Sequence, residues 1–304
     1  MIRALAAVLA LAAATAARAE LVLGFVEEAA EHTADGEKRQ TNLRLGFRRE
    51  GGGWVAICAS NGSPPWDTAC AFPGAASERR WTVVSRGKPI AQVTTRGWLT
   101  QEWYKSEGLL RLEERDPPRV GDRSIAFGGW AALPVHRPLL AFSAAVPAYR
   151  PWTRTAPTQR DKAVAFPLLR DAFPRIRMCG AGGVVDGRTI ATRENHVDVF
   201  DVLQSPGGSR LIGLRVKRRY TQACDGAGDV GSDFWVLQHG TSVRALPVFD
   251  ARGFSASFVP VEAGDFDGDG RDEALFWFSG YNEDGYVLFF DDFTRTARFT
   301  WGYH

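Results

Sequence analysis

After its first residues the sequence contains no uncharged apolar run long enough to cross a bilayer, which takes about 20 residues in a helix. It also shows little helical periodicity and no clear internal repeat. The charges nearly cancel, because Arg3 and Arg18 fall in the first 19 residues and the rest of the chain carries 35 cations against 35 Asp and Glu. A neutral chain lacks the excess positive charge that attracts nucleic acid or anionic membranes. The sequence thus predicts no nucleic-acid partner and no membrane span.

Motifs of the common enzyme classes are missing too. The nearest match to a G-x-S-x-G elbow, GFSAS at Gly253, lacks the second glycine. The five histidines are not spaced to share one face as metal ligands. GAGDVG, residues 226–231, matches a dinucleotide loop but runs into strand-like sequence instead of a helix. The adjacent acids Asp291 and Asp292 are expected on opposite faces of a strand. No catalytic residue is therefore assigned.

The chain begins with an early cation, a short Ala/Leu/Val run and the site Ala17-Arg18-Ala19. This order predicts a secretory signal peptide over residues 1–19 and an exported protein, either periplasmic or extracellular. A membrane anchor is the alternative, but the run is short for a span and ends at Arg18. Residue 20 is Glu and not Cys, so nothing suggests a lipid anchor on the mature terminus.

Four cysteines follow the predicted signal: Cys58, Cys70, Cys179 and Cys224. An even number in an oxidising compartment favours two disulfides. Of three possible pairings we prefer Cys58–Cys70 with Cys179–Cys224, because each would close a compact local unit. Four free buried thiols are the alternative. A zinc site is disfavoured, since no two cysteines have C-x₂₋₄-C spacing.

Short alternating or apolar runs, separated by Gly, Pro and Asp, fill most of the chain. Residues 81–95 predict a hairpin with its turn over residues 86–89, and residues 232–250 predict a strand, a turn and a strand. Residues 209–223 alternate apolar with charged side chains, as a half-buried strand does. The ten tryptophans are interpreted as core residues and not as sugar-stacking platforms. Many short strands with little helix indicate a sandwich, a barrel or a propeller.

One helix is expected around residues 158–173, with Thr158 as its N-cap, although Pro167 would break or kink it. The three prolines of residues 147–157 interrupt regular structure. That stretch is interpreted either as a linker between two halves or as one long surface loop. Residues 20–304 are treated as a single all-β domain.

The stretch GDFDGDGRDEALFWF, residues 264–278, places five acids in nine positions before an apolar run. Calcium takes six to eight oxygen ligands from a flexible site. Carboxylates at positions 1, 3 and 5 of a tight loop can converge, and glycines at positions 4 and 6 permit the positive φ that such a loop needs. The expected ligands are Asp265, Asp267, Asp269, the carbonyl of Arg271 and the carboxylate of Glu273. Asp272 is expected to face solvent, or to exchange roles with Glu273.

Other interpretations of this loop are weaker. An EF-hand needs Glu at position 12, where Phe276 stands, and a helix after the loop, where ALFWFS predicts a strand. Magnesium keeps more waters than so many carboxylates would allow. An acidic turn without metal remains the alternative, but its crowded carboxylates would repel one another.

GDFDGDGRDEALFWFSG resembles the D-x-D-G-D-G-x-x-[D/E] calcium loop of FG-GAP/VCBS-type repeats, found in integrin-α-like β-propellers. The resemblance covers residues 253–290, with one copy and with Glu at the last ligand position. It implies a calcium ion that stiffens a turn between two strands of a blade. The runs ALFWF and YVLFF are apolar on both faces, as strands between packed sheets are.

These observations predict an all-β, β-propeller-like assembly of short antiparallel strands with at most one short helix. The expected function is that of an exported, non-catalytic protein with a structural Ca²⁺, which binds a protein or a glycan. A secreted glycan-directed hydrolase with the same calcium loop is the alternative. A third interpretation is an envelope structural protein that binds its own kind.

Overall fold

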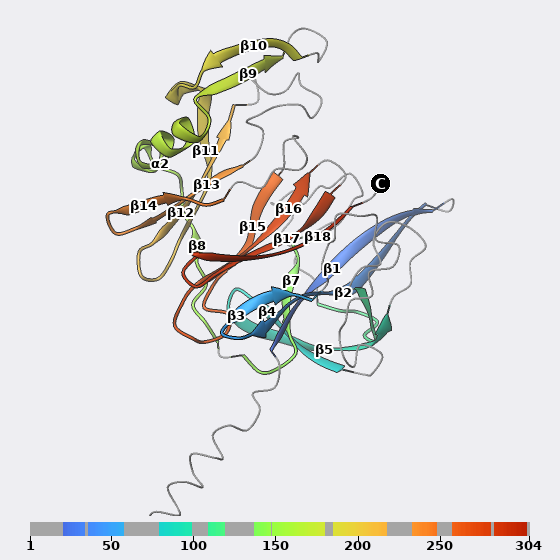
Figure 1. The fold of residues 1–304 in the computed structure, drawn as a ribbon. Coiled ribbons are helices and arrows are strands. Elements are labelled where there is room, and N and C mark those ends of the chain that lie inside the picture. Colours follow the sequence, from blue (N-terminus) through green and yellow to red (C-terminus); the bar gives the residue numbers. More distant parts are fainter. Residues whose placement is uncertain are drawn as a thin grey trace, which may run out of the picture.

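In the computed structural model the described residues are 21–33, 36–57, 79–98, 109–118, 137–146, 148–179, 185–217, 233–247, 257–280 and 283–302. Most of them form β-strands, which build a barrel, two stacked sheets and a separate two-stranded hairpin, with one α-helix (Figure 1). The all-β class with a single short helix is thereby confirmed. The predicted signal peptide, Cys58, Cys70 and Cys224 lie outside the described residues, and of Cys179 only the backbone is described. The predicted disulfides therefore stay predictions.

The N-terminal half forms a closed antiparallel barrel. Its strands are β1 (Val22–Thr33), β2 (Gly36–Glu50), β4 (Arg79–Ser85), β5 (Lys88–Trp98), β6 (Leu109–Leu112) and β7 (Leu139–Phe142). They follow the order β1-β7-β4-β5-β6-β2, and the pairing of β1 with β2 closes the ring; β3 (Gly53–Ala56) extends the sheet beyond β2. The strands expected to form propeller blades here form a barrel instead. The long β1 and β2 pair with each other and also with β7 and β6, which leaves the ring no free edge.

The β4–β5 hairpin confirms the hairpin predicted for residues 81–95, although its turn is shorter than the predicted residues 86–89. Ser85 pairs with Lys88, so the turn consists of Arg86 and Gly87, both with positive φ (51° and 71°). Positive φ at both central residues defines the type I′ turn, which matches the twist of the strands. A Cβ on Gly87 would lie 2.1 Å from the carbonyl oxygen of Tyr149, so this position accepts no side chain.

The C-terminal sheet is a four-stranded antiparallel meander. Its strands are β15 (Ser257–Gly264), β16 (Glu273–Gly280), β17 (Glu283–Phe290) and β18 (Arg295–Gly302). Leu275 and Trp277 of β16 pack in one cluster with the barrel side chains, whereas Phe276 and Phe278 pack in another cluster with the next sheet. The alternation along a strand places these two sets on opposite faces. The expectation that this strand is covered on both faces is confirmed.

The third layer is a five-stranded antiparallel sheet. Its strands are β8 (Thr153–Arg154), β11 (Val197–Gln204), β12 (Arg210–Val216), β13 (Phe234–His239) and β14 (Ser242–Ala245), in the order β14-β13-β12-β11-β8. Trp235 and Leu211 face the four-stranded sheet, and Ile212 and Phe234 pack with α2 (Gln159–Ala172). The hairpin β9 (Arg175–Cys179) and β10 (Val185–Ala191) and the 3₁₀-helix η1 (Glu194–His196) lie between α2 and β11 in the chain.

Helix α2 begins where the sequence predicts. Thr158 caps it through a reciprocal pair of bonds: its hydroxyl accepts from the N–H of Asp161, whose carboxylate accepts from the N–H of Thr158. The helix continues past Pro167 and ends at Ala172, so the proline does not break it. No helix in the described part of the chain is long and apolar enough to cross a membrane.

Tryptophan side chains lie in the core wherever the structure describes them, as the sequence predicted. They are between 0% and 6% exposed and belong to the barrel and both sheets: Trp54, Trp81, Trp152, Trp235, Trp277 and Trp301.

Buried charges join the barrel to the four-stranded sheet. The guanidinium of Arg44 is fully buried, donates to the carboxylate of Glu27 (2.9 and 3.0 Å) and lies 3.9 Å from the ring centre of Trp301. The hydroxyl of Tyr286 donates to the same carboxylate from β17. Burial and the neighbouring Glu27 raise the pKa of Tyr286 well above its ordinary value, so Tyr286 remains a donor.

Candidate metal site

The candidate site is the acidic loop, residues 265–272, which connects β15 to β16. Gly264 and Glu273 pair across the base of the hairpin, so the strands bring both ends of the loop together. Carboxylate oxygens of Asp265, Asp267 and Asp269 all lie within 4.8 Å of one another. The structure therefore brings together the three aspartates that the sequence placed at positions 1, 3 and 5.

The loop folds around its own backbone N–H groups. The Asp265 carboxylate accepts from the N–H of Asp269 (3.0 Å) and of Gly270 (2.9 Å), and the Asp269 carboxylate accepts from the N–H of Arg271 (3.0 Å). Short side chains that bond the backbone in this way form tight turns. Gly268 and Gly270 have φ of 72° and 86°, as expected for glycines at positions 4 and 6.

Two arginines neutralise part of the negative charge of the loop aspartates. Arg49, from β2 of the barrel, pairs with Asp267 and with Asp269 (2.9 Å each). The guanidinium of Arg271 pairs with Asp269 (2.7 Å) and with Asp291. The sequence predicts a role for the carbonyl of Arg271 and none for its side chain. Arg49 is 220 residues away from Asp269, so no local pattern could have indicated it.

Glu273 lies at the base of the acidic loop and holds it by a hydrogen bond. Its carboxylate is buried, 1% exposed, and accepts from the N–H of Phe266 (2.7 Å). It is not part of the group of three aspartates within 4.8 Å. Burial, reinforced by the charge of Asp267, raises the pKa of Glu273 to about 9. A nearby cation would favour its ionised form and reverse this shift.

The pKa values of the aspartates diverge. Burial raises the pKa of Asp267, with Arg49 acting against it. For Asp269 burial acts in the same direction but is outweighed by the hydrogen bonds from Arg271, so its pKa lies below the usual range. Asp269 is thus ionised at neutral pH, and an added cation would lower the raised pKa of Asp267.

The neighbouring turn adds two more acids. Asp291 and Asp292, expected on opposite faces of a strand, lie after β17 in a turn with positive φ (59° and 51°). Asp291 pairs with Arg271, and Asp292 accepts from the N–H of Asp272 (3.1 Å). The expectation was wrong because β17 ends at Phe290, so the alternation of a strand does not apply.

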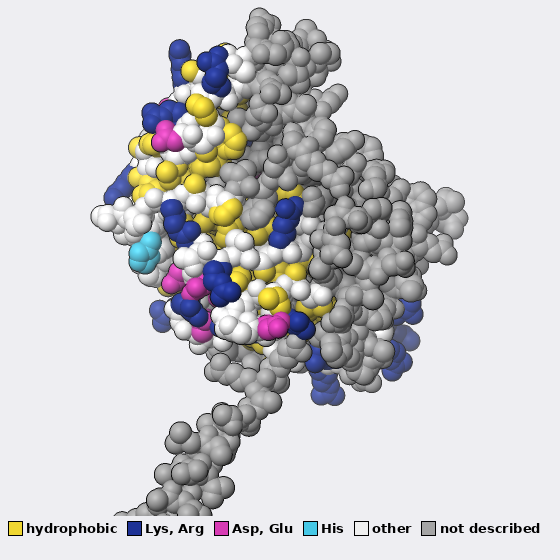
Figure 2. Space-filling model, in the orientation of Figure 1, with side chains coloured by type: hydrophobic (Ala, Val, Ile, Leu, Met, Phe, Trp, Pro, Cys, Tyr) yellow, Lys and Arg dark blue, Asp and Glu magenta, His cyan; other side chains and the backbone are white. Residues whose placement is uncertain are grey.

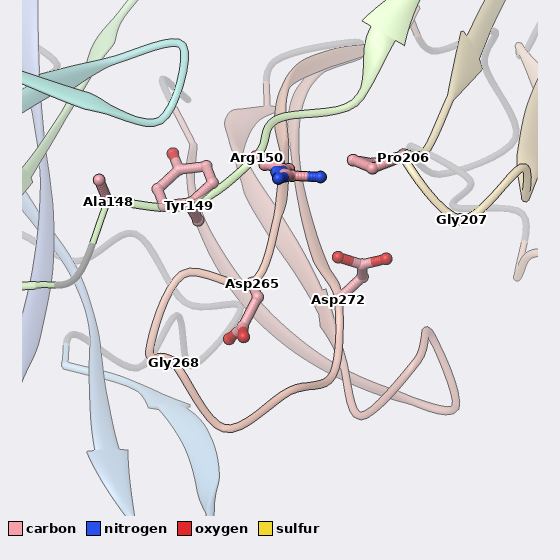
Figure 3. A pocket seen from close by; sticks show the side chains of 8 residues that line it. All are labelled: Ala148, Tyr149, Arg150, Pro206, Gly207, Asp265, Gly268 and Asp272. Atoms are coloured by element: carbon pink, nitrogen blue, oxygen red, sulfur yellow. The ribbon is translucent and has the colours of Figure 1, made fainter.

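A pocket of about 480 Å³ opens beside the loop (Figure 3). Asp265, Gly268 and Asp272 form one side of it, the β11–β12 turn with Pro206 and Gly207 forms another, and the chain at Ala148, Tyr149 and Arg150 forms the third. Asp272, expected to face solvent, is half-buried and directs its carboxylate toward the side where Arg150 lies, while Asp265 turns toward its own loop.

The chain at residues 148–155, within the stretch interpreted as a linker or a surface loop, runs from the barrel to the sheets. The N–H of Tyr149 donates to the carbonyl of Gly87 (3.2 Å), and the N–H of Trp152 donates to that of Ala263 (2.9 Å). The buried carboxylate of Glu262 completes this junction by accepting from Tyr149, Gly87 and Arg137. This part of the pocket wall is therefore held in place on both sides.

Comparisons with protein-family models, with curated proteins and with solved structures give no match for this chain. The likeness of the acidic loop to FG-GAP/VCBS-type calcium loops therefore stays a prediction from its residues.

Replacing Arg49 by alanine is expected to raise calcium affinity about three- to ten-fold, because it removes a cation that occupies oxygens of Asp267 and Asp269. Without calcium the same change should lower the free energy of unfolding by about 1 kcal/mol. Calorimetric titration and urea unfolding measure the two effects. The control is Arg48→Ala, since Arg48 pairs with Glu50 on the same strand. An unchanged or weaker calcium affinity in Arg49→Ala would show that the arginine and the ion do not compete.

Proposed function

We propose that this is an exported, non-catalytic binding protein whose acidic loop holds one structural Ca²⁺. The convergence of the carboxylates of Asp265, Asp267 and Asp269 within 4.8 Å carries the proposal. Hard carboxylate oxygens suit calcium, and the carbonyl of Arg271 and the carboxylate of Glu273 would complete the shell. The hydrogen bonds from the backbone leave further lone pairs on the same oxygens for a cation.

The charge balance of the loop supports a bound cation. Six aspartates line the loop and the adjoining turn, against the guanidinium groups of Arg49, Arg271 and Arg244, the last of which donates to the carbonyl of Asp292 (2.7 Å): Asp265, Asp267, Asp269, Asp272, Asp291 and Asp292. Excess negative charge in so small a volume disfavours the folded loop, and a divalent cation would remove most of it.

The proposed role of the calcium ion is structural. It would fix the β15–β16 hairpin, whose sheet lies between the barrel and the five-stranded sheet. In this proposal the β15–β18 meander corresponds to one blade of the propeller-like family and β11–β14 to its neighbour. What supports this is that both are antiparallel meanders stacked face to face.

Recognition of a protein or a glycan is the proposed role. Charged side chains of both signs occur on the described part of the face in Figure 2, with Lys and Arg more frequent than Asp and Glu. The pocket beside the acidic loop offers a concave surface.

A glycan-directed hydrolase is the second candidate, because Asp265 and Asp272 both line this pocket. Against it, the Asp265 carboxylate is held by two N–H groups of its own loop and turns away from the pocket (Figure 3). Hydrolysis of a glycan that is abolished by Asp272→Asn would decide for the enzyme.

Calorimetric titration of the mature protein with calcium is expected to show one site, and the melting temperature should rise with calcium. At a free calcium concentration of about 100 times Kd the added stability is about 2.7 kcal/mol. Asp267→Ala should abolish both effects, while Asp198→Ala, a change at an exposed position on β11, should leave both intact. No heat and no thermal shift in the unaltered protein would refute the calcium site.

A further inference from the structure

The pocket beside the acidic loop has the chemistry of a carbohydrate site. We propose that it binds an uncharged sugar unit whose hydroxyl groups bond Arg150 and Asp272. This inference rests on the proposed recognition function and selects a glycan as its ligand. Its basis is the lining, which brings charged groups and apolar surface together from three separate segments of the chain.

The charged groups of the pocket suit a neutral polar ligand. Arg150 is exposed and forms no ion pair or hydrogen bond with any residue that the structure describes. Asp272 directs its carboxylate into the same space from the acidic loop, while Asp265 is turned to its own backbone (Figure 3). Arg150 then faces Asp272 across the pocket, and the proposed Ca²⁺ would offset the charge of Asp265, the second carboxylate of the lining, so neither a strongly anionic nor a strongly cationic ligand is favoured. A guanidinium donates several hydrogen bonds and a carboxylate accepts them, as neighbouring sugar hydroxyls require.

The remaining surface suits the apolar face of a sugar ring. Ala148, Pro206 and the ring of Tyr149 contribute carbon surface. The Tyr149 hydroxyl is bonded to Glu262 and its ring packs against Phe266 (5.3 Å between centres), so this wall is fixed. Gly207 and Gly268 add no side chain and leave the opening wide. A volume of about 480 Å³ lies within the range of small-molecule sites.

Calcium is expected to strengthen sugar binding. Gly268 and Asp272, which border the pocket, belong to the loop that the ion would order. A loop that is already ordered need not be ordered by the ligand, so each ligand should raise the affinity for the other by the same factor.

The test uses the full mature protein with calcium and a panel of uncharged sugars: glucose, galactose, mannose, N-acetylglucosamine, cellobiose and chitobiose. Saturation-transfer NMR detects binding, and calorimetry measures affinity. Arg150→Ala and Asp272→Asn should each weaken binding of the preferred sugar by about ten-fold or more. Arg160→Ala removes an exposed arginine of α2 and should leave affinity unchanged. Thermal unfolding and a calcium titration of each variant establish that it folds and whether it retains the ion.

The outcomes separate the pocket from the calcium site. Loss of sugar binding in Arg150→Ala with calcium binding retained supports the inference. No binding of any panel sugar by a protein that binds calcium overturns it and leaves the calcium site standing. Tighter binding of glucuronate or glucosamine than of glucose overturns the uncharged class. If the protein gives no heat of calcium binding but still binds a sugar in a way that depends on Arg150, the result supports the sugar pocket and refutes the proposed ion.

Discussion

Replacing Arg44 by methionine is expected to lower the free energy of unfolding by about 3–5 kcal/mol, because it leaves the buried Glu27 carboxylate without its cation. Methionine fills much of the same volume, so the loss of stability would come from the unpaired charge and not from a cavity. Urea unfolding of the full protein measures the effect. The pair lies between the barrel and the four-stranded sheet, so the result also tests how tightly these two units are joined.

Two further variants make this result specific. Arg48→Met alters a partly exposed ion pair on the same strand and should cost less than about 1 kcal/mol. Adding Glu27→Gln to Arg44→Met removes the unpaired charge and should recover part of the loss. A cost below 1 kcal/mol for Arg44→Met alone would contradict the view that this buried pair joins barrel and sheet.

Without calcium the protein is expected to lose stability as pH rises from about 4.5 to about 9. Glu273 has a pKa of about 9 in the folded protein and near 4.5 when unfolded, so over this range the folded state binds the extra proton. The free energy of unfolding then falls with pH, by up to about 1.4 kcal/mol per pH unit from this group. Urea unfolding in a chelator at several pH values measures the slope.

Glu273→Gln tests the assignment to this side chain. The amide carbonyl can still accept from the N–H of Phe266 and cannot ionise. The variant should have a flatter pH profile and be more stable than the unaltered protein at pH 8–9 in chelator. Calcium should restore stability most at high pH, where the carboxylate is ionised. An equal slope in both proteins would assign the pH dependence to other groups.

Features that depend on neighbours in the chain were predictable. The Thr158 cap is a contact over three residues, and the β4–β5 turn needs only Arg86 and Gly87 between two β-rich runs. Likewise the hydrogen bonds that Asp265 and Asp269 accept within the acidic loop join residues at most five positions apart. The residue types at such spacings suffice to form these contacts, whichever sheets surround them.

Features that join distant segments were not predictable. Arg49 reaches the acidic loop across 220 residues, and Tyr286 reaches Glu27 across 259. The pocket likewise takes its walls from the chain at Arg150, the turn at Pro206 and the loop at Asp272. Nothing in the local sequence of any one segment indicates the other two.

The closure of the barrel shows most clearly what the sequence could not predict. Alternation and apolar runs determined by themselves that β4, β5, β16 and β17 are strands, and that β16 has two faces to bury. They could not determine which sheet covers each face. Burying an apolar face against a barrel gains as much free energy as burying it against another blade. The pairing of β1 with both β2 and β7 decided that, because closing the ring satisfies its edge hydrogen bonds. The sequence thus determined the elements and the acidic loop, and the tertiary structure alone decided which charges and which walls meet there.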